Sequence, residues 1–437
     1  MVSPDHGNDV AASERSSGRE PPVLSGGWPI LGHLQELRKD PVRLFQRVRD
    51  ECGEIGEMNF AGNRVVLLTG DEAQEAFFRG SDEQLDQAAA YPFMTPIFGR
   101  GVVFDASPEQ RRQAMKNQSL KAPMMRQHAE CIAAETRRMM EGLGESGEID
   151  ALDFFSELTI YTSSACLIGR NFREELSPEY FRIFYELERG TDALAYVNPH
   201  LPIPSFWARD RARRKMVALL TEVFDRRAQV EEGDPELFDV LLTLKDEAGK
   251  PRYSIDVITG MFISMMFAGH HTTSGSAAWT LIEMLRNPEV MHGVESELEE
   301  LYADGREVSF QALREIPALE GAIKEALRLH PPLIILMRQV NWDFHYRGFT
   351  VAKGKKVAVS PAISNRMPEC FPDPARFDPA RYEPGRDEDA QTFSWIPFGG
   401  GRHKCVGSQF AQVQLKAIFS ALLLEYEFEL SQPPATY

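Results

Sequence analysis

The sequence lacks the features that mark several classes of protein. Its most apolar stretch, residues 263–268, is far shorter than the roughly 20 residues that a membrane-spanning helix needs. Its five cysteines are scattered and none forms a Cys-x-x-Cys pair, which argues against a disulfide framework, a zinc site and a covalently attached c-type haem. Basic residues number only 48 against 65 acidic ones, and the net charge of −17 disfavours a nucleic-acid partner. We therefore expect a cytoplasmic protein with no membrane anchor.

The spacing of apolar residues predicts a mainly α-helical chain with small β-sheets, an α+β class. Residues 1–20 are polar and small, so we expect a disordered tail there and a single domain over 21–437. Three- and four-residue apolar spacing predicts helices over 124–143, 152–168, 176–190, 209–231, 235–246, 254–285 and 309–328. Strands are expected at 65–69, 343–359 and 425–430. Residues 360–404 show little periodicity, and a long loop in a compact domain is usually functional.

The most informative stretch is FGGGRHKCVG, residues 398–407, which contains Cys405. Helical spacing resumes after Gly407, so Cys405 is placed at a helix N-terminus, where backbone N–H groups and the helix dipole favour a thiolate. The glycines allow the backbone to approach a flat partner closely. A thiolate without a second Cys or His at metal spacing is a poor zinc ligand and a good axial ligand for haem iron. The alternative is a structural cysteine in a glycine-rich turn.

This loop closely resembles the cysteine-ligand loop of the cytochrome P-450 family, whose fold is a triangular helical domain around a buried haem. The family more often has Arg where His403 stands. Glu325 and Arg328 lie three apart on a predicted helix, and together with Arg381 they match the buried ion network of the family. The resemblance implies that this network holds the cysteine loop in place. Taken alone, the Glu/Arg pair would be interpreted as an ordinary solvent-exposed pair on the helix surface.

A second motif, FAGHHTTSG at residues 267–275, lies in the long predicted helix. Its small residues permit close approach of a planar ligand. Its hydroxyl groups can interrupt the backbone hydrogen bonds of the helix and bind water. The alternative is an interior helix with satisfied hydroxyls. By the resemblance, this segment crosses the distal haem face and Thr272 helps to deliver protons during oxygen activation. Most members have Asp or Glu before that Thr, whereas His271 resembles the sterol 14α-demethylases and could relay protons near neutral pH.

A third segment, residues 91–105, places aromatic residues among prolines and glycines, which makes a stiff apolar loop. It resembles the corresponding segment of the sterol 14α-demethylases, although ordinary core is the alternative. The likeness is closest to the bacterial members and covers the chain from about residue 24. The family normally continues beyond a strand like 425–430 into a hairpin whose turn contacts substrate. This sequence ends at Tyr437, so either it is truncated or that edge of the site is missing.

The resemblance implies one non-covalent haem b, with dioxygen as co-substrate. The residues expected to contact the haem are Tyr91, Arg112, Arg338, His403, Ala268, Phe398 and Gly399. The residues expected to contact substrate are Phe93, Met94, Phe98, Phe104, Phe267, Leu333 and Ile335. The implied reaction is sterol 14α-demethylation, by three successive oxidations that release formate. Azole-type inhibitors are expected to bind.

Electrons must come from separate proteins, and the resemblance implies a ferredoxin and a ferredoxin reductase. Arg402, Lys404 and Lys416 cluster in sequence around the cysteine loop, and we expect them to steer an acidic ferredoxin.

Two alternative functions keep part of this interpretation. A monooxygenase for another steroid or a terpenoid would change only the product. A non-catalytic haem-binding sensor or scaffold would not need the His271–Thr272 pair, which disfavours it.

Overall fold

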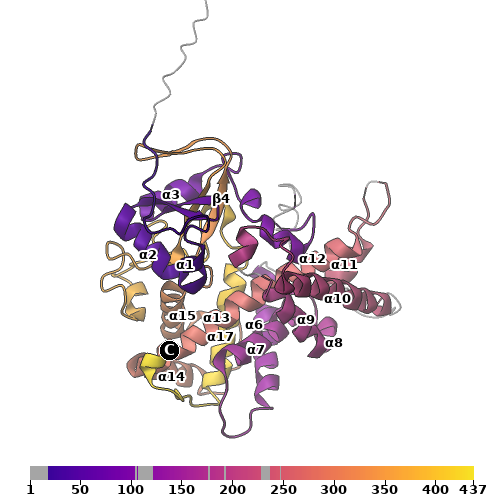
Figure 1. Ribbon diagram of the computed structural model, residues 1–437. Helices are drawn as coiled ribbons and strands as arrows, with labels where there is room; N and C mark the ends of the chain where they lie inside the picture. The colour runs from indigo at the N-terminus through magenta and orange to yellow at the C-terminus, as the bar shows by residue number, and fades with distance from the viewer. Residues whose placement is uncertain are drawn as a thin grey trace, which may run out of the picture.

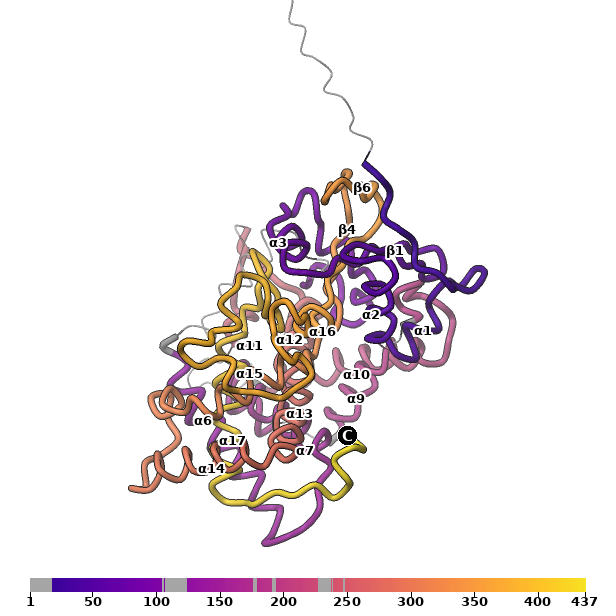
Figure 2. Tube along the Cα trace, turned by 90° about the vertical axis from the view of Figure 1, so that its left-hand side faces the viewer, coloured from indigo at the N-terminus to yellow at the C-terminus, as the bar shows by residue number. Residues whose placement is uncertain are grey.

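The structure is a computed structural model that describes residues 18–103, 106, 122–175, 178–190, 193–227, 237–246 and 248–437. The strands gather at one end of the molecule, at the top of Figures 1 and 2, and helices form the rest. These strands come from the N-terminal part of the chain, shown in indigo, and from residues 336–359, shown in orange, whereas the segment between them is largely helical. The expected class, mainly α with small β-sheets, is confirmed.

A five-stranded sheet has the order β1-β2-β7-β4-β3. Its strands are β1 (Ile55–Phe60), β2 (Asn63–Leu68), β3 (Leu85–Asp86), β4 (Leu336–Val340) and β7 (Lys356–Val359). Only the β2–β7 pair is parallel, and the register places Val66 opposite Val357. A separate hairpin joins β5 (Phe344–Tyr346) to β6 (Phe349–Val351). The sheet therefore ties the N-terminal hairpin to the segment that precedes the cysteine loop.

The helical part is built from long helices, with shorter ones at its edges. The longer helices are α2 (Pro41–Cys52), α6 (Ala122–Met140), α7 (Ala151–Leu167), α9 (Pro178–Glu188), α10 (Pro204–Arg227), α12 (Ile255–Met266), α13 (Thr272–Arg286), α14 (Pro288–Tyr302), α15 (Pro317–Leu329) and α17 (Ser408–Leu423). The shorter helices are α1 (Leu34–Lys39), α3 (Asp71–Arg79), α4 (Thr95–Phe98), α8 (Arg170–Glu175), α11 (Leu237–Thr243) and α16 (Pro361–Ser364). The helices expected over 124–143, 152–168, 176–190, 209–231 and 235–246 are thus confirmed within the described residues.

Capping residues fix where several of these helices begin. Asp150 accepts a hydrogen bond from Asp153 N at the start of α7, and Ser254 accepts one from Val257 N at the start of α12. Pro317 occupies the first position of α15, where its missing N–H costs nothing. For this reason the helix expected over 309–328 begins only at Pro317, and a 3₁₀ turn, η6 (Ala312–Arg314), precedes it.

The long helix expected over 254–285 is present, but it is not uniform. A turn of π-helix, η5 (Phe267–His271), separates α12 from α13. Such turns arise where one extra residue is inserted, and they often occur at functional sites. The helix crosses the middle of the molecule, where α13 packs against α7 and α15. The central helices α6, α7, α12, α13, α15 and α17 share one large hydrophobic core.

Two other expectations about strands had different outcomes. The strands expected over 343–359 are present as β5, β6 and β7. The strand expected at 425–430 is wrong, because the described residues place no strand beside it. The alternating aromatic residues of this segment pack against the core without forming a strand. Tyr426 and Phe428 contact the large core, and Tyr426 Oη donates to Gly144 O at 3.0 Å.

The described part of the chain begins inside the expected polar tail. Arg19 N donates to Gly348 O, and Thr350 N donates to Arg19 O, so backbone pairing with β6 starts before residue 21. Residues 1–17 lie outside the described residues. Among the helices that are described, none is long and apolar enough to span a membrane.

Candidate functional site

The cysteine loop folds back on itself between β7 and α17. Cys405 N donates to Phe398 O at 2.9 Å, and Gly399 N donates to Ile396 O at 3.0 Å. Gly401 has a φ of +61°, and a Cβ there would lie 2.4 Å from Phe78 O. Only glycine fits at this position, because the conformation is left-handed and the backbone of Phe78 is too close.

Cys405 comes just before α17, with its side chain accessible. Burial raises the pKa of the Cys405 thiol, while the Gly407 N–H, the Lys404 charge and the Ser408 N–H act to lower it. A bound metal cation would supply the remaining stabilisation of the thiolate. The described residues include no group of three His, Cys, Asp or Glu side chains that could hold a metal ion. A lone accessible thiol at a helix N-terminus fits the axial ligand of an iron porphyrin.

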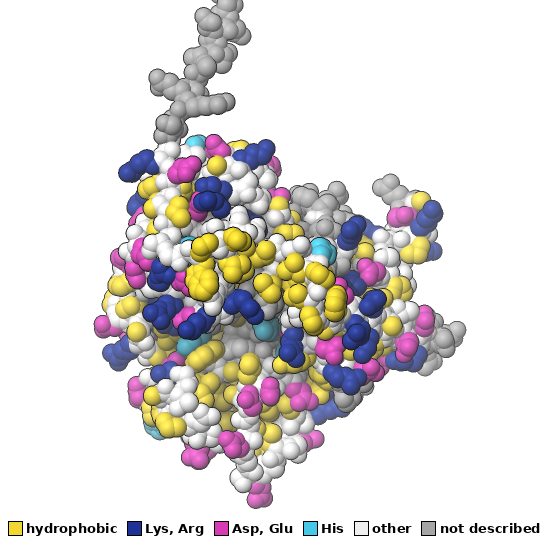
Figure 3. Space-filling model, in the orientation of Figure 1, with side chains coloured by type: hydrophobic (Ala, Val, Ile, Leu, Met, Phe, Trp, Pro, Cys, Tyr) yellow, Lys and Arg dark blue, Asp and Glu magenta, His cyan; other side chains and the backbone are white. Residues whose placement is uncertain are grey.

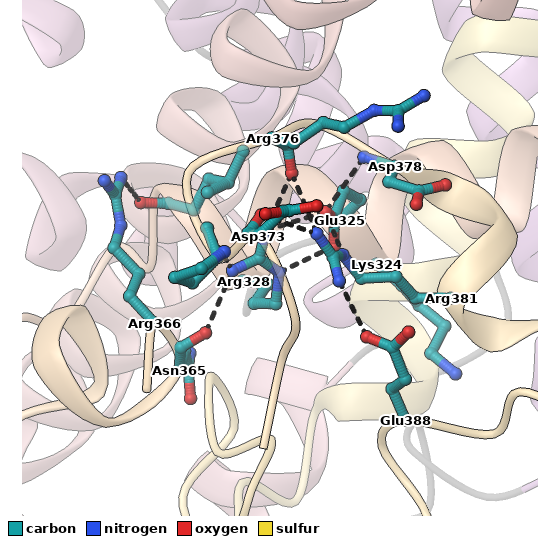
Figure 4. Close-up of polar contacts among 12 residues, drawn as sticks. Lys324, Glu325, Arg328, Asn365, Arg366, Asp373, Arg376, Asp378, Arg381 and Glu388 are labelled. Atoms are coloured by element: carbon teal, nitrogen blue, oxygen red, sulfur yellow. Dashed lines mark hydrogen bonds and ion pairs between the residues drawn. The ribbon is translucent and has the colours of Figure 1, made fainter. Parts of the chain in front are cut away.

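The structure brings Glu325, Arg328 and Arg381 together in a fully buried network, shown in Figure 4. Arg328 donates from Nε and Nη2 to the two Glu325 carboxylate oxygens, both at 2.7 Å. Arg381 Nε donates to Glu325 Oε1 at 3.0 Å, and Tyr382 Oη donates to Oε2 at 2.7 Å. Every oxygen of the buried carboxylate is therefore paired, as a buried charge requires.

Asn365 connects this network to the cysteine loop, and nothing in the sequence marked it. Arg328 Nη1 donates to Asn365 O at 3.1 Å, and Ile396 N donates to Asn365 Oδ1 at 3.1 Å. Ile396 in turn holds Gly399, so the chain of bonds runs from the network to the loop of Cys405. These contacts support the predicted role of the network in orienting the loop.

The π turn displays the second motif. Ala268 is exposed, and Thr272 Oγ1 donates to Ala268 O at 2.7 Å. Gly269 faces the core, where a Cβ would lie 2.9 Å from Ser163 Oγ. The small residues thus set one face of the turn against α7 and leave the Ala268–Thr272 face open.

Glu188 lies beside the two histidines of the π turn, and no sequence pattern predicted it there. It ends α9 and is mostly buried, with Oε1 3.3 Å from His270 Nε2 and 3.5 Å from His271 Nδ1. His270 is buried, and its Nδ1 lies 3.0 Å from Thr159 Oγ1. His271 instead keeps 66% of its side chain exposed. A carboxylate from a distant helix therefore holds both histidines, while only His271 remains open to a ligand.

The predicted aromatic loop forms a wall, but it is in two parts. Phe93 packs in one core cluster with Met94 and Ile335, and its ring lies 4.1 Å from that of Tyr196, a contact that no sequence pattern predicted. Phe98 packs edge-on against Phe267 at 5.5 Å, in the large helical core.

Other predicted site residues have these positions. Tyr91 Oη accepts from Met337 N at 2.8 Å, and burial raises the pKa of Tyr91. Arg338 is buried in β4 next to Met337. His403 Nε2 lies 2.5 Å from Asp82 Oδ1, and Leu333 is 49% exposed. Two further predictions lie outside the described residues: Phe104 and Arg112.

The fold and the cysteine loop define a class, and the comparisons agree with it. Residues 21–436 match the model of the Cytochrome P450 family, and the chain belongs to that family. The structure is similar to the retinoic acid-bound cyanobacterial CYP120A1, with a TM-score of 0.82 at 22% identity, covering 93% of this chain and 92% of the other. This likeness establishes the fold.

Relatives within the family are sterol 14α-demethylases. The chain is 58% identical to the Sterol 14alpha-demethylase of Mycobacterium tuberculosis, over 95% of this chain and 93% of the relative. It is 57% identical to that of Mycolicibacterium vanbaalenii, over 96% and 94% of the two chains. The Lanosterol 14-alpha demethylase of Homo sapiens is 31% identical, over 94% and 82%.

Proposed function

We propose that this cytochrome P450 is a sterol 14α-demethylase, a single cytoplasmic domain over residues 21–437. The observation that carries the proposal is the 58% identity to a mycobacterial sterol 14alpha-demethylase along nearly the whole of both chains. The substrate methyl group would undergo three successive oxidations, each consuming one dioxygen and two electrons. The methyl carbon then leaves as formate, and a ring double bond forms.

The cofactor proposed is haem b, held without a covalent bond. Cys405 would bind the iron as a thiolate, and Arg338, Tyr91 and His403 would bind the propionates through charge-assisted hydrogen bonds. Arg112 would join them, and Ala268, Phe398 and Gly399 would flank the ring. When bound, the haem iron supplies the chemistry that activates dioxygen for insertion into a C–H bond.

Residues at the junction of the π turn and α13 would move the protons. Thr272 Oγ1 is held by its bond to Ala268 O, so its hydroxyl oxygen is free to accept a proton donor from the open side. His271 is exposed and lies next to it in sequence, with Glu188 positioned to stabilise the imidazolium. We assign proton delivery to Thr272 and His271, and positioning to Glu188.

Thr272→Ala is expected to bind haem and substrate but to form product about 10²-fold more slowly, with electrons lost as peroxide, because a positioned proton donor contributes at least that much. His271→Ala should slow product formation more than it weakens binding. Product, NADPH consumption and peroxide are measured together. Thr221→Ala is the control, since Thr221 Oγ1 makes the same 2.7 Å bond to the carbonyl four residues earlier, on α10. Wild-type rate and coupling in both site variants would remove this assignment.

The apolar wall favours binding of a rigid polycyclic substrate. It combines Phe93, Met94, Phe98, Phe267 and Ile335, with Leu333 exposed beside them and Phe104 expected to join them. Titration of lanosterol, obtusifoliol and cholesterol-like steroids against the Soret band tests the proposal. The first two, which carry a 14α-methyl group, should bind in the micromolar range or tighter and shift the band. Preference for a steroid without that methyl group would point instead to another monooxygenase reaction. An azole should displace the sterol.

A ferredoxin and its reductase are the proposed electron donors, but the docking patch is smaller than the sequence suggested. Lys416 is buried: its Nζ donates to Leu313 O at 3.0 Å and is ion-paired with Glu320. The expectation that it faces a partner is wrong, because its position on α17 turns it inward. Arg402 and Lys404 are exposed beside Cys405 and make up the corrected patch.

Reduction by an acidic ferredoxin should slow as ionic strength rises, because salt screens the steering charges over a Debye length of ~10 Å at 0.1 M. Arg402→Glu with Lys404→Glu should slow it further at low salt. Lys39→Glu with Lys353→Glu changes the charge equally at exposed positions elsewhere. Stopped-flow reduction rates decide the matter: equal rates for the two double variants would place docking elsewhere.

A further inference from the structure

A basic hollow lies between α4 and α10. Two adjoining cavities, of about 610 and 310 Å³, share Pro96, His200 and Arg213 in their walls. Both are open to solvent rather than enclosed, so a ligand would reach their walls from the surface. Figure 3 shows dark blue side chains gathered over α10 on the face in view. We call this region, with the residues named in the next two paragraphs, the α10 hollow.

The charges in the α10 hollow do not balance. Four arginines line it, against two aspartates. Both aspartates are occupied: Asp256 pairs with Arg213 at 2.8 Å, and Asp210 pairs at 2.8 Å with Arg209, which is buried behind the lining. The other lining arginines form no ion pair with any described residue: Arg100, Arg211 and Arg214. A chain with a net charge of −17 thus gathers around one hollow three guanidinium groups that have no ion-pair partner within the described part of the chain.

Arg213 is the buried member of the four arginines. It is nine-tenths buried, and its Nη1 and Nη2 are used by Asp256 and by Phe98 O. Its Nε is buried and has no hydrogen-bond partner among the described residues. The Nε atom has almost no accessible surface, so a ligand in the hollow would meet the positive charge of Arg213 rather than a free N–H group.

One wall of the α10 hollow is apolar. Trp207 is 57% exposed and lines it together with Pro96. An exposed indole beside several guanidinium groups suits a ligand that has an anionic head and an apolar or ring-bearing body. The hollow is a different place from the cysteine loop and the π turn. It borders the substrate wall along α4, where Arg213 Nη2 donates to Phe98 O.

We propose that the α10 hollow is a binding site for a phosphate group. A phosphate offers several acceptor oxygens and up to two negative charges, which match guanidinium forks better than a single carboxylate does. Arg211 and Arg214, one turn apart on α10, hold the phosphate with Arg100 opposite them. Arg213 adds its positive charge from below, and Trp207 covers the body of the ligand. The site is independent of the proposed demethylation.

The test uses the full-length haem protein and inorganic phosphate, titrated by calorimetry at constant ionic strength. Arg211→Gln with Arg214→Gln is expected to weaken phosphate binding at least about tenfold, since charge-assisted bonds carry the affinity. Lys39→Gln with Lys353→Gln makes the same change in net charge and should bind like the wild type. Arg211 and Arg214 are exposed, so the variant should keep its fold, which circular dichroism verifies.

Vesicles distinguish the source of the phosphate. Sedimentation with equal parts phosphatidylcholine and phosphatidylglycerol, against phosphatidylcholine alone, asks whether the group belongs to a lipid. Binding to the anionic vesicles that the double variant and Trp207→Ala both weaken would assign a lipid headgroup. Phosphate binding without vesicle binding would assign a soluble phosphate compound. No measurable binding of phosphate to the wild type, or equal affinity in the Arg211→Gln, Arg214→Gln variant, would overturn the proposal.

Discussion

Glu325→Gln is expected to lower the free energy of unfolding by about 3–5 kcal/mol and to yield protein without stably bound haem. The substitution keeps the shape of the side chain but removes its charge. It leaves the Arg328 guanidinium buried beside a neutral partner and Arg381 with Glu388 as its remaining carboxylate. Tyr382 Oη also loses a charged acceptor. Such a large effect follows from the complete burial of the network, because an ion pair at the surface is worth far less.

Denaturant unfolding and the ratio of Soret absorbance to protein absorbance measure the two effects. Glu315→Gln is the matched control: Glu315 also makes two bonds to one arginine, Arg306, but at the surface, and its loss should change neither quantity appreciably. Asn365→Ala tests the connection between the network and the loop, because it leaves the ion pairs intact and removes only the acceptor for Ile396 N. It should lower the free energy of unfolding by about 1–3 kcal/mol. Normal haem content and stability in Glu325→Gln would show that the network does not hold the loop.

The features that the sequence predicted well are those carried by local residues. The helix after Gly407 and the position of Cys405 before it follow from apolar spacing within one segment. The same holds for α7, whose cap and apolar face lie close together in sequence. Glu325 and Arg328 could be matched because they share one helix, and Arg381 only because a family pattern connected it to them.

Features that depend on contacts between distant segments could not be predicted. Glu188 carries no local signal, yet α9 brings it to both histidines of the π turn. Asn365 is an ordinary loop residue until its amide meets Ile396. The π turn itself leaves the apolar spacing of the long helix intact. Lys416 shows the opposite error, because charge in a sequence suggests a surface position, whereas a buried acceptor can hold it inside.

Cys405→Ser is expected to abolish the thiolate signature completely. A serine hydroxyl can still accept the Gly407 and Ser408 N–H groups, so α17 should begin as before and the fold should persist. It cannot supply a thiolate to iron, because its hydroxyl stays protonated at neutral pH and its oxygen is a harder ligand. Cys370→Ser, at a partly buried cysteine outside the cysteine loop, is the control and should behave like the wild type.

The difference spectrum of the reduced carbon-monoxide complex tests the thiolate assignment most directly. The wild type and Cys370→Ser should absorb near the wavelength from which the family takes its name, and Cys405→Ser should lose that band while circular dichroism stays unchanged. An undiminished band in Cys405→Ser would contradict the assignment of Cys405 as the iron ligand.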